Sequence, residues 1–121
     1  MIIVDTSVCI DHLRVPETHL ESLLQQQLIR MHPYLIGELA LGSLRNYDAV
    51  IAAFLEMPQA VVATPDEVLF TIKRHSLVAT GIGYVDAHIL ASATLMPDTL
   101  IWTRDKRLNT VAHRFGRAWT A

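Results

Sequence analysis

Short runs of apolar and β-branched residues alternate along this chain with longer segments of helical character. Parallel strands need crossover connections, which are usually helices. The alternation therefore predicts right-handed crossovers and a parallel sheet covered by helices on both faces. The expected strands are 2–4, 29–31, 60–63, 99–102 and 117–120, and the expected helices are 8–13, 18–28, 33–44, 47–56, 64–81, 84–95 and 103–116. Together they indicate an α/β fold.

Length and composition narrow the class of protein. The 121 residues suit a single domain, 1–121, and 51% hydrophobic against 18% charged residues is far from the composition of disordered chains. A formal net charge of -2 excludes a globally basic binder of nucleic acid or membranes, although it leaves room for a local basic patch. The lone Cys9 excludes a disulfide framework, and no apolar run reaches membrane-spanning length. We therefore expect a cytoplasmic protein with no membrane partner.

Two acidic residues stand where a strand gives way to a helix. Asp5 follows the first expected strand directly, and Asp105 comes three residues after Trp102, at the end of the fourth. If the strand order reverses between these two strands, as in doubly wound sheets, both side chains face the crevice where ligands bind. Either aspartate also suits the cap of the following helix, so the two interpretations stay open here.

Two further acids lie on apolar helix faces. The residues three and four positions from Glu38 and from Asp86 are almost all apolar or glycine, and the helix around Asp86 carries hardly any other charge. A solvated carboxylate belongs on a polar face, although a purely structural glutamate remains an alternative for Glu38. A buried aspartate costs several kcal/mol unless it is paired or bound to metal. Asp86 is therefore the stronger candidate for a functional role.

Four converging carboxylates would repel one another and raise one another's pKa without a cation between them. A hard divalent ion such as Mg²⁺ or Mn²⁺ suits such oxygen ligands, whereas zinc suits them poorly. A cation held in this way polarises a phosphorus centre and lowers the pKa of its bound water. The acidic set therefore predicts hydrolysis of phosphodiester bonds.

Four segments of the chain resemble the PIN domain family, and specifically its small bacterial VapC toxins. They are 2–7, 37–39, 83–91 and 100–108, and with the element order they cover nearly the whole chain. The resemblance implies a three-layer α/β/α fold with a mainly parallel five-stranded sheet in the order 3-2-1-4-5. It also implies a toxin of a toxin–antitoxin pair that acts as a Mg²⁺- or Mn²⁺-dependent endoribonuclease.

The family's site carries over residue by residue. Asp5, Glu38, Asp86 and Asp105 match the acidic metal-binding and catalytic set. The resemblance implies that Asp5 and Asp86 are the principal ligands, and that Glu38 binds directly or through water. The role implied for Asp105 is to orient water or a second ion.

The resemblance also covers supporting groups and partners. Thr6, Ser7 and Thr103 match polar positions beside the acids, whereas His32 stands where the family more often has Ser or Thr. The implied partners are an RNA substrate, a second copy of the chain, and a cognate VapB-type antitoxin whose C-terminal segment lies across a groove near the site. A larger toxin–antitoxin assembly is a further expectation.

Basic residues gather near the C-terminus. Five of the ten Lys and Arg residues fall within fourteen positions, opposed only by Asp105: Arg104, Lys106, Arg107, Arg114 and Arg117. We predict that Arg104, Lys106, Arg107 and Arg114 form a rim that contacts RNA phosphates, with a solvated helix face as the alternative. Arg14 and Arg45 are weaker candidates, and a ligand role for His88 is a minor possibility.

Two other functions remain open. A receiver-like signalling domain is also a small parallel α/β fold with an acidic pocket, but its paired acids after the first strand are missing, because Thr6 follows Asp5. A catalytically inactive binding domain that keeps the acidic metal pocket is the other alternative. Loss of metal-dependent RNA cleavage on substitution of Asp5 or Asp86 would separate a nuclease from both.

Overall fold

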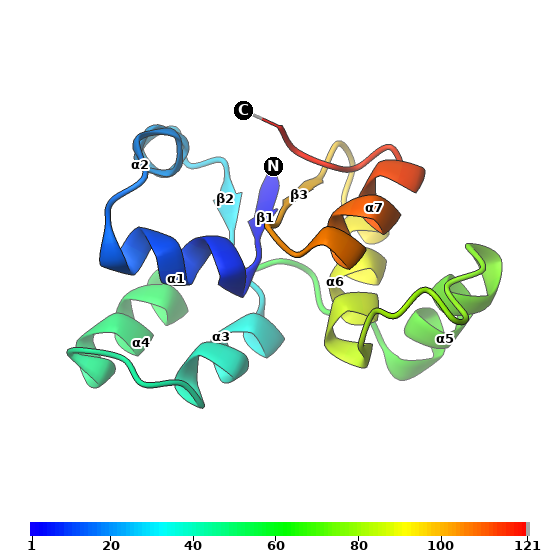
Figure 1. Cartoon of the computed structure of the whole chain (residues 1–121), viewed down its shortest axis with the longest axis horizontal. Helices are drawn as coiled ribbons and strands as arrows, with labels where there is room; N and C mark the ends of the chain where they lie inside the picture. The colour runs from blue at the N-terminus through cyan, green and yellow to red at the C-terminus, as the bar shows by residue number, and fades with distance from the viewer. Residues whose placement is uncertain (121) are drawn as a thin grey trace.

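The computed structural model describes residues 1–120, and a parallel three-stranded sheet lies at its centre (Figure 1). The strands are β1 (Ile2–Val4), β2 (Ile29–Arg30) and β3 (Leu100–Trp102), in the order β2-β1-β3. Ile2 pairs with Ile29 on one side and with Leu100 on the other. The first strand is therefore the middle of the sheet, and the connection from β2 to β3 crosses β1 and reverses the direction in which strands are added.

Seven helices surround this sheet in the described part of the chain. Helices α1 to α4 lie on one side of the strands and α5 to α7 on the other (Figure 1). Their bounds are α1 Thr6–Arg14, α2 Thr18–Gln25, α3 Pro33–Ala40, α4 Tyr47–Glu56, α5 Pro65–Arg74, α6 Tyr84–Leu95 and α7 Lys106–Arg114. The expected α/β fold with helices on both faces is confirmed.

The expectation of five strands is wrong. The segments 60–63 and 117–120 form no strands, and each outer position holds a single parallel bridge: Met31 with Gln59, and Ile101 with Ala118. The inner strands have only two or three residues, so an outer strand has few partners for its backbone groups. The segment beyond Gln59 leaves the sheet, with Val61 and Val62 exposed. The bridges keep the predicted order of segments across the sheet without forming strands.

Four helices are shorter than expected, one of them α7, which spans Lys106–Arg114 instead of 103–116. Helix α2 ends at Gln25, α3 at Ala40 and α5 at Arg74, whereas the sequence predicted continuation to 28, 44 and 81. Gln27 and Ser76 adopt the left-handed conformation just after α2 and α5, which stops each helix within two residues. Gly81 has φ 84° but lies well beyond α5, in the loop that leads to α6. It is therefore not the cap that the sequence predicted.

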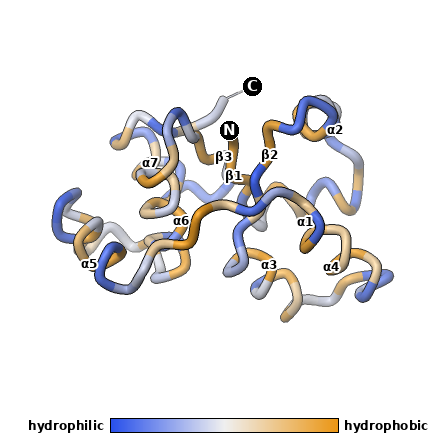
Figure 2. The backbone as a smooth tube through the Cα atoms, turned by 180° about the vertical axis from the view of Figure 1, so that it is seen from behind, coloured by the Kyte–Doolittle hydropathy of each residue, from blue (hydrophilic) through white to orange (hydrophobic). Residues whose placement is uncertain are grey.

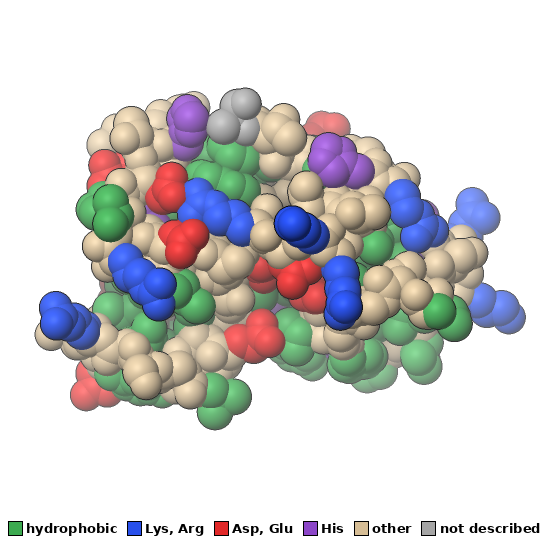
Figure 3. All heavy atoms as spheres, viewed as in Figure 1, with side chains coloured by type: hydrophobic (Ala, Val, Ile, Leu, Met, Phe, Trp, Pro, Cys, Tyr) green, Lys and Arg blue, Asp and Glu red, His purple; other side chains and the backbone are tan. Residues whose placement is uncertain are grey.

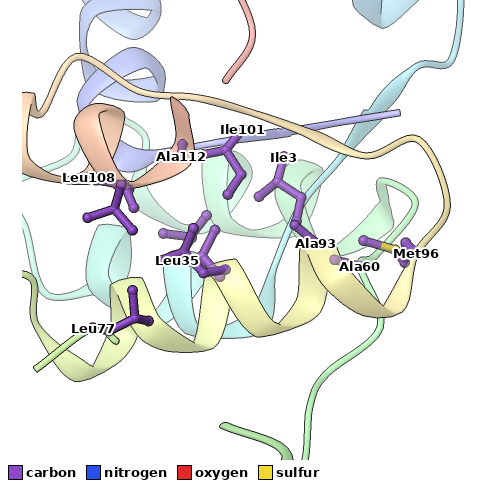
Figure 4. Close-up of a cluster of buried hydrophobic side chains, with 12 residues drawn as sticks. Ile3, Leu35, Ala60, Leu77, Ala93, Met96, Ile101, Leu108 and Ala112 are labelled. Carbon is purple, nitrogen blue, oxygen red and sulfur yellow. The ribbon is translucent and has the colours of Figure 1, made fainter. Parts of the chain in front are cut away.

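The strands divide the core into two layers because their side chains alternate between faces. Ile3 and Ile101 pack with residues of α6 and α7, including Ala93 and Leu108 (Figure 4). Ile2, Val4 and Trp102 face the other way, where they pack against the side formed by α1, α2 and β2. Figure 2 shows the hydrophobic strands in the interior of the chain trace. This packing fixes where the three strands end, and hence where the residues after them lie.

Helix α6 is the most enclosed helix, since residues 87–93 are all buried. Its burial on nearly every side explains why the sequence around Asp86 carries almost no charge. Within residues 1–120, no helix is both long and apolar enough to cross a membrane.

Candidate metal-dependent active site

Three of the four predicted acids lie at helix N-termini near the carboxyl edge of the sheet. Asp5 follows β1 and precedes α1, Asp105 precedes α7 after β3, and Asp86 lies in the first turn of α6. Because β1 and β3 are parallel neighbours, the residues that follow them emerge at the same edge. The positive ends of three helix dipoles therefore favour negative charge there. Figure 3 shows acidic side chains gathered near the middle of this face, with basic side chains on both sides.

Asp5 is held by two hydroxyl groups. Its side chain is buried, and its Oδ2 accepts hydrogen bonds from Ser7 Oγ at 2.8 Å and from Thr103 Oγ1 at 2.7 Å. It stands at the cap position of α1 but makes no side-chain capping bond. Among residues 1–120, no hydrogen bond reaches its Oδ1. The carboxylate is thus oriented through one oxygen, which leaves the other for a ligand.

The same two hydroxyls tie the loop after β3 to this carboxylate. Ser7 Oγ accepts a hydrogen bond from the backbone N–H of Arg104, and Thr103 Oγ1 accepts one from that of Asp105, both at 3.0 Å. Of the three predicted supporting residues, Ser7 and Thr103 therefore contact Asp5. The third, Thr6, is the first residue of α1, and no side-chain hydrogen bond joins it to the rest of the described chain.

The arrangement of the acids makes ionisation of Asp86 unfavourable. Burial, followed by the charges of Asp5, Asp105 and Glu38, raises its pKa to about 6, while the backbone N–H of Gly83 acts in the opposite direction. Each of the other three acids is thus close enough to interact electrostatically with Asp86. The sequence expectation that these four residues share one neighbourhood agrees with this placement.

Glu38 and Asp105 lie at the exposed margin of the group. The pKa of Glu38 is raised by burial and then by the charge of Asp5. Asp105 Oδ1 accepts a hydrogen bond from the backbone N–H of Leu108 at 3.0 Å, so this acid does cap its helix. The two strand-to-helix acids therefore differ, since Asp105 caps α7 whereas Asp5 is turned toward the hydroxyls.

The donor set fits a hard cation that retains water. Within residues 1–120, no three His, Cys, Asp or Glu side chains lie close enough to hold a metal ion by themselves. The group is nevertheless composed of carboxylate oxygens, and Asp5 has one of them unbonded. Mg²⁺ characteristically binds through one or two carboxylates and keeps several waters. A loose carboxylate group therefore suits Mg²⁺ or Mn²⁺ better than a closed protein cage would.

The charge of Arg104 is not available for the predicted contact with RNA phosphates. Its guanidinium forms ion pairs with Asp11, at 2.6 Å, and with Glu17. It thereby connects the loop after β3 to α1 and to the start of α2. We conclude that Arg104 braces the wall of the site rather than presenting a free cation to phosphate.

Three other basic residues of the predicted rim line a groove instead. Lys106, Arg107 and Arg114 surround a space of about 300 Å³ with Thr80 and Thr110. The guanidinium groups of Arg107 and Arg114 bond backbone carbonyls, those of Gly81 and His75, and neither forms an ion pair with a carboxylate in the described chain. Its lining starts in sequence at Lys106, the residue after Asp105, so the groove lies along the helix that this acid caps.

Several aromatic residues that the sequence analysis did not assign to the site also shape this region. The ring of His32 caps α3, since its Nδ1 accepts the backbone N–H of Tyr34, and its Nε2 bonds Ser92 Oγ at 3.0 Å. The ring of Tyr34, on α3, and the ring of Tyr84, on α6, both pack against the ring of His88, which is also on α6. The spacing of Tyr34 four positions before Glu38 was the available signal, because such residues share a helix face.

A family model described as PIN domain matches residues 2–114, a span that holds all four acids. The chain belongs to the PIN domain family. A curated relative, Ribonuclease VapC32, is 43% identical over 118 residues in each of two Mycobacterium tuberculosis strains, CDC 1551 and H37Rv. The match covers 98% of this chain and 95% of the relative.

Membership of the PIN domain family removes one of the alternative functions that the sequence left open. The receiver-like signalling domain is set aside, because the family match extends over both strand ends and both helices that carry the acids. The acids of this PIN domain come from segments up to 100 residues apart, Asp5 and Asp105 being the extremes. The fold, rather than any local motif, brings them together.

Proposed function

We propose that this PIN domain is the toxin of a toxin–antitoxin pair and acts as a Mg²⁺- or Mn²⁺-dependent endoribonuclease. The observation that carries the proposal is the placement of four carboxylates around the carboxyl edge of the sheet, where burial and the charges of the other three raise the pKa of Asp86. The near full-length likeness to a protein named as a ribonuclease supports RNA as the substrate. Residues 1–121 act as one domain in this proposal.

The acids divide the work according to their surroundings. In this proposal Asp5 and Asp86 would hold the cation, Glu38 would bind it directly or through water, and Asp105 would orient water or a second ion. The cation supplies a lowered pKa for bound water and stabilises charge at the phosphorus centre and the leaving oxygen. The protein's part is positional, because the carboxylates are already gathered in one place before the substrate arrives.

Ser7 and Thr103 keep Asp5 in the orientation that this role requires. Both hydroxyls donate to Oδ2, so rotation of the carboxylate would break two hydrogen bonds in a buried setting. Oδ1 is the oxygen that faces the cation in this proposal. Hydroxyl partners of this kind correspond to the outer groups that orient metal ligands in other proteins.

The direct test is cleavage of total cellular RNA by the purified protein with Mg²⁺, with Mn²⁺ or with EDTA. We expect discrete fragments with either metal and none with EDTA, and mapping of the fragment ends then identifies the target. Folded, antitoxin-free protein that cleaves no RNA under any of these conditions would favour the alternative of an inactive binding domain.

Replacing Thr103 with valine removes one hydroxyl from Asp5 while nearly keeping the side-chain volume. We expect the concentration of Mg²⁺ for half-maximal cleavage to rise by about 10- to 100-fold, the usual cost of losing an outer partner of a metal ligand. Thr94→Val is the matched control, since the Thr94 hydroxyl bonds only a carbonyl of its own helix, that of Ala91. An equal rise in both variants would contradict a specific role for Thr103.

The α7 groove, which is lined by Lys106, Arg107 and Arg114, is the proposed binding site for RNA phosphates. These three residues span about 12 Å along the helix, given a rise of 1.5 Å per residue. Backbone carbonyls hold Arg107 and Arg114 in place without neutralising them. Arg104 is left out of this proposal because Asp11 and Glu17 compensate its charge.

Binding of RNA to an Arg107→Ala, Arg114→Ala double variant tests the groove. The slope of log affinity against log salt concentration should become shallower by roughly 1 for each RNA phosphate that the variant no longer neutralises. The measurement uses a background in which Asp86 is replaced by asparagine, so that the RNA stays intact. Arg30→Ala, whose guanidinium also bonds backbone carbonyls but lies outside the groove, should leave the slope unchanged. A slope that the double variant also leaves unchanged would remove the groove from the RNA path.

A VapB-type antitoxin is the proposed protein partner. An apolar groove of about 190 Å³ runs between α1, α2 and α4, and its lining includes Cys9, Leu13, Leu20, Leu24 and Phe54. An apolar segment of the antitoxin fits such a groove, and copurification followed by loss of RNA cleavage would report the contact. Dimerisation, a larger assembly and a cytoplasmic location stay predictions.

A further inference from the structure

The side chain of Arg104 is held by three other side chains. Its guanidinium pairs with Asp11, on α1, at 2.6 Å and with Glu17, which precedes α2. The guanidinium carbon also lies 5.9 Å from the centre of the Trp102 ring, within the range of a cation–π contact. Within residues 1–120 these are the only ion pairs. We call Arg104, Asp11 and Glu17 the clamp.

The backbone of Arg104 reaches the group that orients Asp5. Its N–H donates to Ser7 Oγ at 3.0 Å, and Ser7 in turn donates to the Asp5 carboxylate. The residue before it, Thr103, donates to the same carboxylate, and the residue after it is Asp105. A shift of Arg104 would therefore break the bond to Ser7 and displace both of its neighbours in the chain.

The clamp joins two segments that are distant in the sequence and that both begin at an acid of the site. Asp11 lies on α1, the helix that follows Asp5, whereas Arg104 lies in the loop between β3 and α7. Within the described residues, the last backbone hydrogen bond between these segments joins the Asp5 N–H to the Trp102 carbonyl at 2.9 Å. Beyond that bond only side chains hold the loop to α1, and the clamp supplies the charged contacts.

We propose that Arg104 is a positioning residue that fixes the loop carrying Thr103 and Asp105. Through this loop it sets the orientation of the Asp5 carboxylate. The proposal rests on the proposed metal-dependent function and adds to it a residue that touches neither the cation nor the RNA. Exposed ion pairs are individually weak, but here two acids share one planar guanidinium, whose donors can bond both at once. Outer groups that hold metal ligands in place strengthen metal binding.

A purely electrostatic role for Arg104 has the opposite consequence. Removing a cation beside a group of carboxylates strengthens the binding of another cation, because a repulsion is lost. Loss of the clamp weakens that binding, because the Asp5 carboxylate loses its fixed orientation. The direction in which Mn²⁺ affinity changes in Arg104→Gln therefore separates positioning from electrostatics.

The test measures two properties of RNA-free Arg104→Gln protein. Its affinity for Mn²⁺, measured by calorimetry, should fall by about 3- to 10-fold, at or below the lower end of the range for outer partners of metal ligands. The amides of residues 104 and 105 in the metal-free protein should exchange hydrogen about 3- to 10-fold faster, measured by NMR. Arg104→Lys should recover part of both properties, because lysine keeps the charge but lacks the planar set of donors.

Arg14→Gln is the matched control. Arg14 is exposed, lines the same hollow as Asp11 and Glu17, and forms no ion pair in the described chain. Its replacement makes the same change in net charge and should neither weaken Mn²⁺ binding nor speed exchange at residues 104 and 105.

A second variant, Asp11→Asn, Glu17→Gln, breaks the clamp from its other side. It should also speed amide exchange at residues 104 and 105. Combining it with Arg104→Gln should add little, because both changes remove the same contacts. Effects on exchange that simply add would contradict the clamp.

The remaining outcomes separate the clamp from the proposed function. Unchanged exchange at residues 104 and 105 in folded Arg104→Gln protein overturns the proposal, and so does Mn²⁺ binding as tight as in the wild type or tighter. Wild-type protein that binds no Mn²⁺ refutes the metal site of the proposed function. Faster exchange in Arg104→Gln would then still support Arg104 as the residue that positions the loop.

Discussion

Replacing Asp86 with asparagine is expected to reduce metal-dependent RNA cleavage by more than about 100-fold. Loss of an outer partner of a metal ligand already costs about 10- to 100-fold, and Asp86 is proposed to contact the cation itself. The substitution keeps the shape of the side chain and removes its charge. Cleavage of total RNA at saturating Mg²⁺, followed by gel electrophoresis, measures the effect.

The same substitution should not weaken the fold. In metal-free protein, burial and the charges of Asp5 and Asp105 oppose ionisation of Asp86, so asparagine relieves an unfavourable charge. We therefore expect equal or higher resistance to urea in EDTA, together with the loss of cleavage. This combination separates an active-site residue from one whose removal merely unfolds the domain.

Asp66→Asn is the matched control for this experiment. Asp66 also lies in the first turn of a helix, α5, but it is exposed and lies outside the acidic group. The control should cleave RNA like the wild type. Full activity in folded Asp86→Asn protein would remove this residue from the site and with it the central part of the proposed mechanism.

The contribution of His32 to stability is expected to fall as the pH drops from about 6.5 toward 4, because the buried ring resists protonation, whereas the raised pKa of Asp86 acts in the opposite direction over the same range. Burial, with a smaller contribution from His88, lowers the pKa of His32 from 6.5 to about 4. Between these values the unfolded chain binds a proton that the folded domain excludes. The His32 contribution therefore rises with pH across this window and is fully present above it.

The hydrogen bonds of His32 explain why the neutral ring is required. Its Nδ1 accepts the backbone N–H of Tyr34, so the ring proton is on Nε2, which donates to Ser92 Oγ. Protonation of Nδ1 would break the cap of α3. With His32 fully buried, the loss amounts to roughly 2–3 kcal/mol over the window.

Urea unfolding at a series of pH values measures this dependence. In an Asp86→Asn background, which removes the opposing titration, His32→Asn keeps a capping side chain that does not titrate, so its stability should change less between the two pH limits than that of Asp86→Asn alone. His113→Asn alters an exposed histidine in the last turn of α7 and should keep the dependence of Asp86→Asn alone. Identical pH profiles with and without His32→Asn in this background would show that another group controls acid stability.

The order of elements could be read from the sequence because each signal is local. The three strands that form are β-branched or apolar runs, and the caps at Thr64 and Asn46 mark the starts of α5 and α4 within one residue. The outer segments 60–63 and 117–120 have strand composition but form no strands beside the single bridges. Whether such a segment pairs depends on the length of its neighbour in the sheet, which its own residues do not contain.

The acids were visible as residues out of place, but their individual roles were not. Asp5 and Asp105 occupy equivalent strand-to-helix junctions, and capping was open for both. The structure separates them. The carboxylate of Asp105 accepts a hydrogen bond from the backbone N–H of Leu108, whereas that of Asp5 accepts hydrogen bonds from the hydroxyls of Ser7 and Thr103. Arg104, similar in sequence context to Lys106 and Arg107, was misplaced in the phosphate rim because its partners, Asp11 and Glu17, are more than 80 residues away.

By itself the sequence determined which residues are charged, where strands and helices alternate, and which four carboxylates stand among apolar neighbours. These properties depend on residue type and on spacing over a few positions. Only the tertiary structure decided which oxygen of Asp5 is left free, which arginines keep an uncompensated charge, and that the rings of Tyr34 and Tyr84 both pack against His88. Those properties depend on contacts between segments distant in the chain, which exist only after the core has packed.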